Sequence, residues 1–259
     1  MHILLTNDDG IHSPGLAAMA EACLNRGHSV IIVAPAEQQS AASQHITLSS
    51  PLLVRSVPWE GADAFAVQGT PADCVRLARP LSDKPVDFAF SGINDGGNAG
   101  SAVFYSGTIA AAREARMCGL KSFAVSIDIS ASEEMRLHLA FLALDLAEKL
   151  QPMEWPRMSL ISLNAPSLPP AKLKPLAYAP LSSAYYLDQY EQRISPRNQR
   201  YFWLGKGLNT ESHLPGTDMD LLEKGHTTLS LIGSWQDDCT WLKQTLGHLP
   251  SDNSDVKPD

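Results

Sequence analysis

The chain has 259 residues, of which 44% are hydrophobic and 19% charged, and its formal net charge is −8. This size and composition are ordinary for a globular protein and allow one large α/β domain with an extensive core. The negative net charge argues against sequence-blind binding to nucleic acid, which requires positive charge on the protein.

The first 35 residues predict a strand, a helix and a second strand. Residues 2–6 (HILLT) form a short apolar run, and residues 28–35 (HSVIIVAP) form a second run rich in β-branched side chains. Pro14 is tolerated in a first helical turn, and Gly27 is a typical helix stop. Between them, apolar side chains recur at helical spacing, at Leu16, Met19, Ala20, Cys23 and Leu24. Such a unit forms two parallel strands joined by a right-handed crossover.

The same alternation continues as far as residue 164. Thr70 is the predicted N-cap of one helix, with Pro71 at its first position and Asp73 as a capping carboxylate. Further strands are predicted at residues 63–69, 86–92, 122–127 and 158–164, and further helices at residues 70–81, 108–119 and 132–150. Strands that alternate with helices in this order predict a doubly wound parallel α/β sheet.

The pattern changes after Asn164, where proline becomes frequent. Segments such as LKPLAYAP (173–180) and QRYFWLG (199–205) look like strands outside the βαβ pattern. This region is rich in aromatic side chains suited to an interface, namely Tyr185, Tyr186, Tyr201, Phe202 and Trp203. We therefore interpret it as an arm used in assembly.

These patterns predict a single domain over residues 1–248. Its catalytic α/β core covers about residues 1–164, and the oligomerisation arm covers about residues 165–235 and returns to the core. The remaining residues, 249–259, are polar and are expected to form a disordered tail.

Three loops at predicted carboxyl ends of strands carry oxygen-bearing side chains. Asp8 and Asp9 follow the first strand. Ser40 lies in the loop after the second strand, and Asn94 follows the strand over residues 86–92. Ligands of an open α/β sheet bind at this edge. Carboxylate, hydroxyl and amide oxygens suit hard cations such as Mg²⁺ and Mn²⁺, whereas zinc prefers cysteine and histidine.

The third of these loops also fits an anion. Residues 96–108 are rich in glycine and lead into a predicted helix, and free backbone N–H groups at a helix N-terminus favour phosphate. The predicted phosphate-binding residues are Asn98, Ser106, Gly107 and Thr108. Carboxylates for a cation beside amides for a phosphate favour phosphoester chemistry, with Asp8 and Asp9 as the catalytic pair.

Each of these features has an ordinary explanation when it is taken alone. A DDG triplet is common in turns, and Ser106 or Thr108 alone would be a helix cap. Asn94 beside glycine can adopt a left-handed backbone. Their convergence on one edge of the sheet favours a site. His12 and His45 lie near that edge, and we interpret both as surface or packing histidines rather than proton donors.

Other polar and sulfur-containing side chains are expected to be structural. Cys23 and Cys118 fall on apolar helix faces and are predicted to be buried thiols. Arg113 and Glu114 are predicted to lie on a solvated helix face. The chain begins directly in a strand pattern, and its longest apolar stretch (139–150) contains charges and is too short to cross a bilayer. We therefore expect a cytoplasmic protein without membrane association.

Five ordered blocks of the sequence resemble the signature blocks of the SurE (survival protein E) family. They are ILLTNDDGIHSPG, VAPAEQQSAASQHITL, GTPADCV, SGINDGGNAG and YSGTIAAAREAR, and weaker similarity continues through SPRNQRYFWLG and GTDMDLLEKG. The chain differs from the usual family pattern in its second loop, where Ala36, Gln38 and Gln39 stand in place of charged residues.

The resemblance implies a Rossmann-like α/β/α sandwich with a C-terminal β-rich arm exchanged between subunits of a homodimer or homotetramer. It also implies one divalent cation per subunit, Mg²⁺ or Mn²⁺. By position, the ligands of that cation would be Asp8, Asp9, Ser40 and Asn94. The implied activity is hydrolysis of nucleoside 5′- and 3′-monophosphates, and in some members of short polyphosphate, so the expected partner is a small-molecule nucleotide.

Two other functions share parts of this pattern. A covalent aspartyl phosphatase needs a second Asp two positions after its nucleophile, where this chain has Gly10. The alternative from another class is a non-catalytic receiver-like or nucleotide-binding α/β module. A receiver needs a phosphoacceptor Asp at the end of a later strand, but the strand over residues 86–92 ends with Ser91 and Gly92.

Overall fold

The computed structural model describes residues 1–184, 186–187, 189–205, 208–209 and 214–233. The predicted tail therefore lies outside the described residues, as do Cys239 and Tyr185. The described α-helices are α1 (Pro14–Asn25), α2 (Pro71–Leu81), α3 (Gly107–Met117), α4 (Glu133–Leu150) and α5 (Asp218–Glu223). Short 3₁₀ helices cover Gly100–Phe104 and Pro170–Lys172.

The strands form one large sheet and two small ones. Those of the large sheet are β1 (His2–Thr6), β2 (Ser29–Pro35), β3 (Val54–Ser56), β4 (Asp63–Val67), β5 (Phe88–Asp95), β6 (Lys121–Ile127), β7 (Ser159–Ala165), β8 (Lys174–Tyr178) and β13 (His226–Gly233). Those of the small sheets are β10 (Tyr190–Ile194) with β11 (Arg200–Leu204), and β9 (Tyr186–Leu187) with β12 (Leu208–Asn209).

The large sheet has nine strands in the order β3-β4-β2-β1-β5-β6-β7-β13-β8. Its six central strands, from β4 to β7, pair in parallel. From β1 the chain winds through β2 to β4 on one side, and then from β5 through β6 to β7 on the other. The order reverses between β1 and β5, which confirms the predicted doubly wound sheet.

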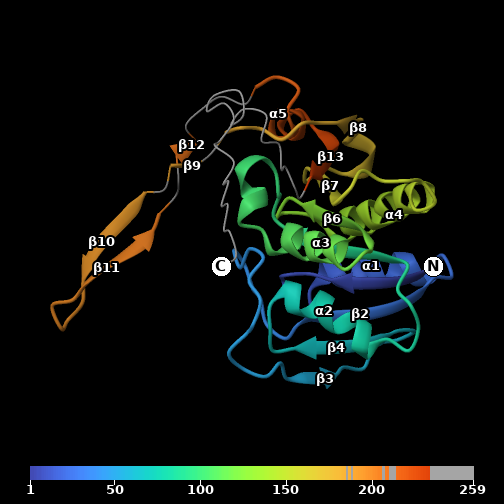
Figure 1. Ribbon diagram of the computed structural model, residues 1–259. Coiled ribbons are helices and arrows are strands. Elements are labelled where there is room, and N and C mark those ends of the chain that lie inside the picture. The colour runs from blue at the N-terminus through green and yellow to red at the C-terminus, as the bar shows by residue number, and fades with distance from the viewer. Residues whose placement is uncertain (185, 188, 206–207, 210–213, 234–259) are drawn as a thin grey trace, which may run out of the picture.

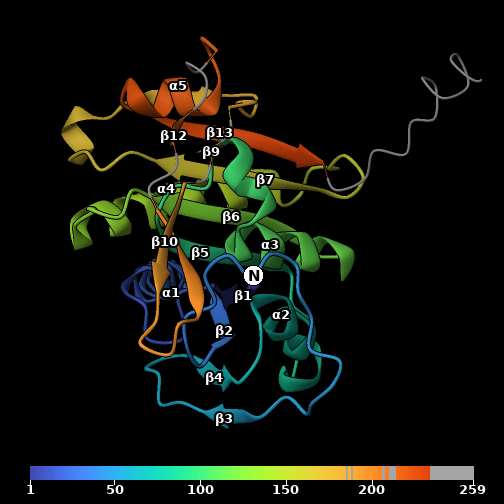
Figure 2. The ribbon, with the colours of Figure 1, turned by 90° about the vertical axis from the view of Figure 1, so that its left-hand side faces the viewer.

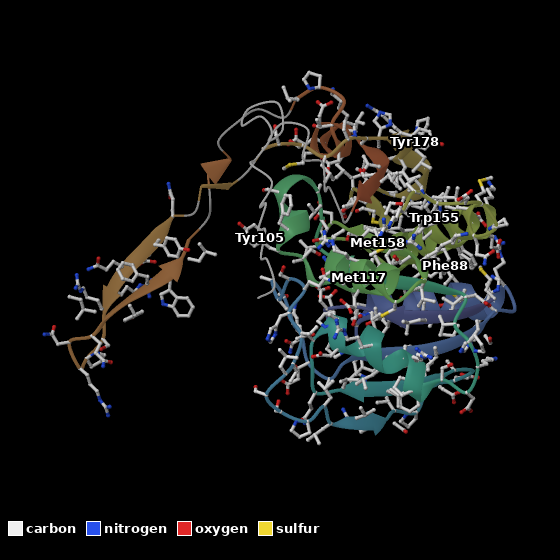
Figure 3. All side chains as sticks on the ribbon, viewed as in Figure 1. Phe88, Tyr105, Met117, Trp155, Met158 and Tyr178 are labelled. Carbon is white, nitrogen blue, oxygen red and sulfur yellow. The ribbon has the colours of Figure 1, made fainter. Side chains whose placement is uncertain are left out.

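Helices cover both faces of this sheet. α1 and α4 pack together on one face, and α2 and α3 pack together on the other (Figure 2). In the core, the ring centroid of Phe88 lies 5.0 Å from that of Phe90, 5.5 Å from that of Phe123 and 6.2 Å from that of Trp155. Figure 3 labels Phe88 and Trp155. None of the described helices has the length and apolarity that a membrane crossing requires.

Local sequence explains where α2 begins. The Thr70 side chain accepts a hydrogen bond from the Asp73 backbone N–H at 3.2 Å, and the Asp73 carboxylate accepts one from the Thr70 N–H at 3.0 Å. Together they form a capping box, with Pro71 at the first helical position. The predicted N-cap and capping carboxylate are therefore confirmed.

Part of the range predicted as an arm belongs to the main sheet. β13 pairs antiparallel with β7 and parallel with β8, and α5 packs on β13. The segment that extends away from the body is the β10–β11 hairpin (Figure 1). The projecting part is therefore narrower than residues 165–235, because strands distant in sequence complete the edge of the sheet.

Two predictions about α3 are wrong. Cys118 is exposed, because it is the C-cap residue at which the chain leaves the helix. Glu114 is only 2% exposed, because α2 and the loop that carries Gln44 pack against its side of α3. Its carboxylate accepts hydrogen bonds from Arg76 Nε at 2.6 Å and Gln44 Nε2 at 2.8 Å. Arg113 is half-buried.

Candidate active site

The predicted site residues gather where the sheet order reverses, at the carboxyl ends of β1 and β5. A cavity of about 530 Å³ opens at this point. Loops that follow three different strands contribute to it. Its lining includes six of the predicted residues: Asp8, Asp9, Ser40, Asn94, Asn98 and Ser106. The structure thus brings together side chains that are up to about a hundred residues apart in the sequence.

Asp8 is the more buried of the two adjacent carboxylates, with 5% of its surface exposed. Its Oδ1 accepts a hydrogen bond from Thr108 Oγ1 at 2.5 Å. A Cβ on Gly107 would lie 2.8 Å from both Cβ and Oδ2 of Asp8, so a glycine lets α3 approach this closely. Burial raises the pKa of Asp8, although hydrogen bonds from Thr108 and from nearby backbone N–H groups oppose the shift.

Asp9 lies beside it at the mouth of the cavity. Its Oδ2 accepts a hydrogen bond from the Asp95 N–H at 3.2 Å, and its Oδ1 accepts a long one from Gln38 Nε2 at 3.4 Å. Burial, with the charges of Asp8 and Asp95, raises the pKa of Asp9 to about 6, although the Asp95 N–H opposes the shift. Within the described part of the chain, neither Asp8 nor Asp9 forms an ion pair. A bound cation would satisfy both carboxylates.

Ser40 and Asn94 add two neutral oxygen donors. Ser40 is exposed, and its Oγ accepts a hydrogen bond from Gln38 Nε2 at 2.9 Å. Asn94 Nδ2 donates to the Gly96 carbonyl at 2.6 Å, which leaves its Oδ1 available as a ligand. Where the structure describes the chain, no three His, Cys, Asp or Glu side chains form a metal-binding group. A cation here would therefore need the hydroxyl and the amide as well as the two carboxylates, and such a set suits Mg²⁺ or Mn²⁺.

The N-terminus of α3 borders the same cavity. Ser106 caps the helix by accepting a hydrogen bond from the Ile109 N–H at 3.1 Å. Gly107 and Thr108 lie behind the cavity wall, and the Thr108 hydroxyl is already used by Asp8. The backbone N–H groups of these two residues also face the Asp8 carboxylate, so they can offer a phosphate the positive end of the helix dipole but not the Thr108 side chain. The predicted histidines, His12 and His45, are exposed and do not line the cavity.

Three positions near the site were not predicted from the sequence. Arg136, in the first turn of α4, forms a two-point ion pair with Asp95, with Nε–Oδ1 and Nη2–Oδ2 distances of 2.9 Å. This pair neutralises a third carboxylate beside the cavity. Ser126 and Asn164 are the penultimate residues of the apolar strands β6 and β7, and both are buried. A polar residue at the end of an apolar run was the signal that could have identified them.

Apolar side chains form the outer wall of the cavity. Tyr105, 68% exposed, and Leu204, from the β10–β11 hairpin, both line it. Figure 3 shows Tyr105 on the side of the body from which the hairpin extends. An aromatic and apolar wall of this kind suits a ligand with a planar ring.

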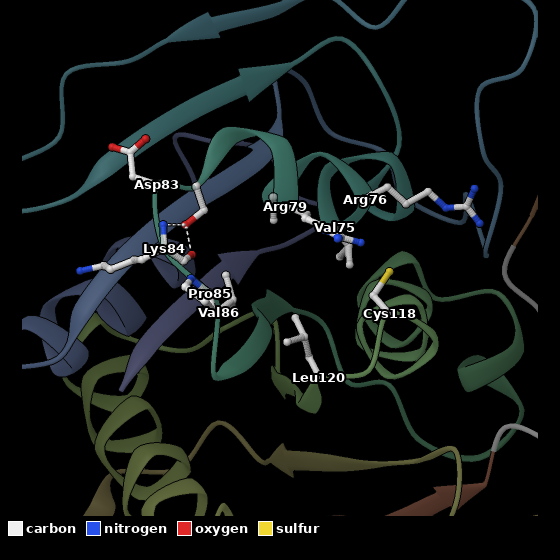
Figure 4. A pocket seen from close by; sticks show the side chains of 11 residues that line it. Val75, Arg76, Arg79, Asp83, Lys84, Pro85, Val86, Cys118 and Leu120 are labelled. Carbon is white, nitrogen blue, oxygen red and sulfur yellow. Dashed lines mark hydrogen bonds between the residues drawn. The ribbon is translucent and has the colours of Figure 1, made fainter.

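A second cavity, of about 730 Å³, lies at the opposite edge of the sheet (Figure 4). It is bordered by the C-terminal ends of α2 and α3, with apolar side chains such as Val75, Val86 and Leu120. Its lining has a single carboxylate, Asp83, and no group of oxygen donors like that around Asp8. Although this cavity is larger, its chemistry does not match a cation-assisted reaction at phosphorus.

Comparison with known proteins gives consistent matches. Residues 3–188 match the model of the family described as Survival protein SurE. The 5'-nucleotidase SurE of Solidesulfovibrio magneticus is 40% identical over 232 residues, which cover 89% of this chain and 90% of that protein. The 5'-nucleotidase SurE of Nitratidesulfovibrio vulgaris (strain DP4) is 38% identical over 235 residues, covering 89% and 92%. The crystal structure of the SurE protein from Aquifex aeolicus has a TM-score of 0.80 and 28% identity, covering 95% of this chain and 98% of that one.

Proposed function

The chain belongs to the SurE family, and we propose that it is a nucleotidase that hydrolyses nucleoside 5′-monophosphates to nucleoside and phosphate. Relatives that match over most of its length are named 5'-nucleotidases. The observation that carries the proposal is a single cavity that joins the adjacent carboxylates Asp8 and Asp9 to the N-terminus of a helix, α3. Such a cavity offers both a cation site and an anion site.

We propose one divalent cation per subunit, Mg²⁺ or Mn²⁺, held by Asp8, Asp9, Ser40 and Asn94. Two findings support this ligand set. The two carboxylates have raised pKa values and no ion-pair partner among the described side chains, and the two neutral donors line the same cavity. When bound, a divalent cation supplies Lewis acidity toward the phosphoryl group and toward water.

The side chains of the protein account for binding and proton transfer. Asn98 and Ser106 hold the phosphate and stabilise charge on its oxygens, and the N-terminus of α3 at Gly107 and Thr108 adds the positive end of the helix dipole. The water oxygen forms the new bond to phosphorus, and the bond from phosphorus to the nucleoside oxygen breaks. Asp9 Oδ1, with only a long hydrogen bond to Gln38, accepts the proton lost by the water. The leaving nucleoside oxygen takes a proton from solvent.

The proposal extends to further substrates, to the cellular location and to the oligomeric state. We propose that 3′-monophosphates and short polyphosphate are further substrates, and that the chain works in the cytoplasm as a homodimer or homotetramer. The assembly proposal rests on the β10–β11 hairpin, where Tyr190, Phe202 and Trp203 are each more than half exposed. Aromatic side chains on a projecting hairpin suit a contact between subunits.

A metal-by-substrate panel tests the proposed function. EDTA-treated protein would be supplied with Mg²⁺, Mn²⁺ or no metal and assayed with 5′- and 3′-nucleoside monophosphates and tripolyphosphate. We expect phosphate release from 5′-monophosphates only with added metal. Asp9→Asn should abolish it, whereas Asp83→Asn, at the distant cavity, should leave it unchanged. Metal-independent turnover, or nucleotide binding without turnover, would favour a different chemistry or the non-catalytic α/β module.

A further inference from the structure

A row of polar residues crosses the sheet beneath the candidate phosphate site. In the register of the parallel strands, Asn94 on β5 lies opposite Ser126 on β6, and Ser126 lies opposite Asn164 on β7. Three neighbouring strands thus carry a polar side chain at the same level. Ser126 and Asn164 are 1% and 2% exposed. Polar groups buried so deeply need hydrogen-bond partners, and Asn98, in the loop that follows β5, is a partner of both.

The side-chain amide of Asn164 binds the backbone of Asn98 at two points. Its Oδ1 accepts a hydrogen bond from the Asn98 N–H at 2.8 Å, and its Nδ2 donates to the Asn98 carbonyl at 3.2 Å. This is the pairing that a neighbouring strand would make, but it is made by a side chain. Asn164 Nδ2 also donates to Ser162 Oγ at 3.1 Å, so both hydrogens of the amide are used.

The side chain of Asn98 is held from the same row. Asn98 Nδ2 donates one hydrogen to Ser126 Oγ at 2.8 Å, and its second hydrogen stays available. Because Asn98 lines the cavity, that N–H can reach a bound phosphate oxygen. Backbone and side chain together therefore leave Asn98 little freedom, and its orientation depends on Asn164.

We propose that Asn164 is a positioning residue for phosphate, which acts by holding Asn98 at the wall of the cavity. This inference rests on the proposed function, because it deepens the assignment of Asn98 to the phosphate. It separates two properties of the site. Asn164 governs affinity for the phosphate group. Three of the four proposed cation ligands, Asp8, Asp9 and Ser40, lie on loops that Asn164 does not touch, and the fourth, Asn94, lies in β5, ahead of the backbone that Asn164 binds.

The test compares Asn164→Ala and Asn164→Asp with a matched control, Ser162→Ala. The control removes the third hydrogen bond of Asn164 and leaves both bonds to Asn98. Two affinities are measured for each protein: the inhibition constant of inorganic phosphate in the nucleotidase assay, and the Mn²⁺ concentration that gives half of the metal-induced rise in melting temperature. The second measurement uses the metal alone.

We expect both Asn164 variants to raise the phosphate inhibition constant about tenfold or more, since a buried backbone group loses its partner. The Mn²⁺ midpoint should stay within about twofold of wild type in every variant. This measurement is the control for a general loss of stability, which would change the affinities for phosphate and for Mn²⁺ together. Ser162→Ala should change neither affinity. Phosphate affinity in both Asn164 variants equal to that of wild type would overturn the proposal.

Hydrogen exchange of the wild-type chain gives a readout that does not depend on whether the variants fold. The Asn98 amide should exchange as slowly as the amides of β6 and β7, and fast exchange at Asn98 would overturn the proposal. Failure of the proposed function itself looks different. If the proposed function is wrong, the wild type neither hydrolyses nucleoside monophosphates nor binds phosphate. If only the proposed role of Asn164 is wrong, the wild type is active and the Asn164 variants bind phosphate as it does.

Discussion

Thr108 Oγ1 lies 2.5 Å from Asp8 Oδ1, so a hydroxyl in the first turn of α3 donates to the carboxylate that follows β1. The hydroxyl is fully buried, and it orients the carboxylate toward the cavity. The helix whose N-terminus is the proposed phosphate site therefore also positions a proposed cation ligand. The first three predictions follow from this arrangement.

Thr108→Val removes the hydroxyl at nearly constant volume. We expect the affinity for Mn²⁺ to fall about tenfold or more, because groups that orient a metal ligand typically contribute a factor of this size. Thr108→Ser keeps the donor and should retain most of the affinity. Calorimetric titration of the EDTA-treated protein with Mn²⁺ measures the change, and equal affinities for the valine and serine variants would contradict this role.

Asp8→Asn should have two opposed effects. It should abolish activity by weakening the cation site, and it should slightly raise the melting temperature of the metal-free protein by removing repulsion between Asp8 and Asp9. In the wild type, a hundredfold excess of Mn²⁺ over its Kd should stabilise the fold by about 2.7 kcal/mol. A variant that keeps both its activity and the metal-induced rise in melting temperature would show that the two carboxylates only form a turn.

Gly107→Ala places a methyl group 2.8 Å from the Cβ of Asp8. Either α3 or the loop after β1 must shift, and such overpacking typically costs about 1–3 kcal/mol. We expect a lower melting temperature and a loss of activity larger than the loss of stability explains. Gly233→Ala, where a Cβ meets nothing within 4 Å, is the control and should change neither property. Activity in Gly107→Ala equal to wild type would show that α3 can move without disturbing Asp8.

The buried carboxylate of Asp73 should make stability depend on pH in the acid range. Burial alone would raise the pKa of Asp73, but hydrogen bonds from Thr70 and Thr47 outweigh it, and the pKa is lowered. The stability it contributes is therefore present above the ordinary carboxylate pKa of about 3.9 and is lost as the pH falls through the lower folded-state value. Asp73→Asn should unfold at lower urea concentration at pH 7, with the difference shrinking below about pH 4. A constant difference across that range would contradict the assignment.

The exposed aromatic residues of the β10–β11 hairpin predict an assembly of at least two subunits. Trp203→Glu should weaken that assembly by about 2 kcal/mol or more, as expected for an aromatic residue at the centre of an interface. Light scattering at micromolar concentration measures the mass. Gln199→Glu, exposed near the tip of the same hairpin, makes the same change of charge and should leave the mass unchanged. A monomeric wild type would contradict the proposed role of the hairpin.

The sequence by itself determined the elements of the core and the place of the site. Apolar runs identified the buried parallel strands and helical spacing identified the helices from β1 to β7, apart from the short edge strand β3 (Val54–Ser56), which is exposed and carries no apolar run. Polar side chains at or beyond the carboxyl ends of β1, β2 and β5 then had to meet, because parallel strands present these ends at one edge. This is why Asp8, Ser40 and Asn94 could be grouped before any coordinates were known.

Only the tertiary structure decided which polar groups face each other. No local sequence pattern predicts that β13 pairs with β7, that Glu114 forms an ion pair with Arg76, or that the Asn164 side chain binds the backbone of Asn98. These contacts join residues 38 to 74 positions apart, and they depend on strand register and helix packing. The periodicity of apolar residues shows which side of a helix or strand is buried. It carries no information about the partner, which the packing of the whole chain supplies.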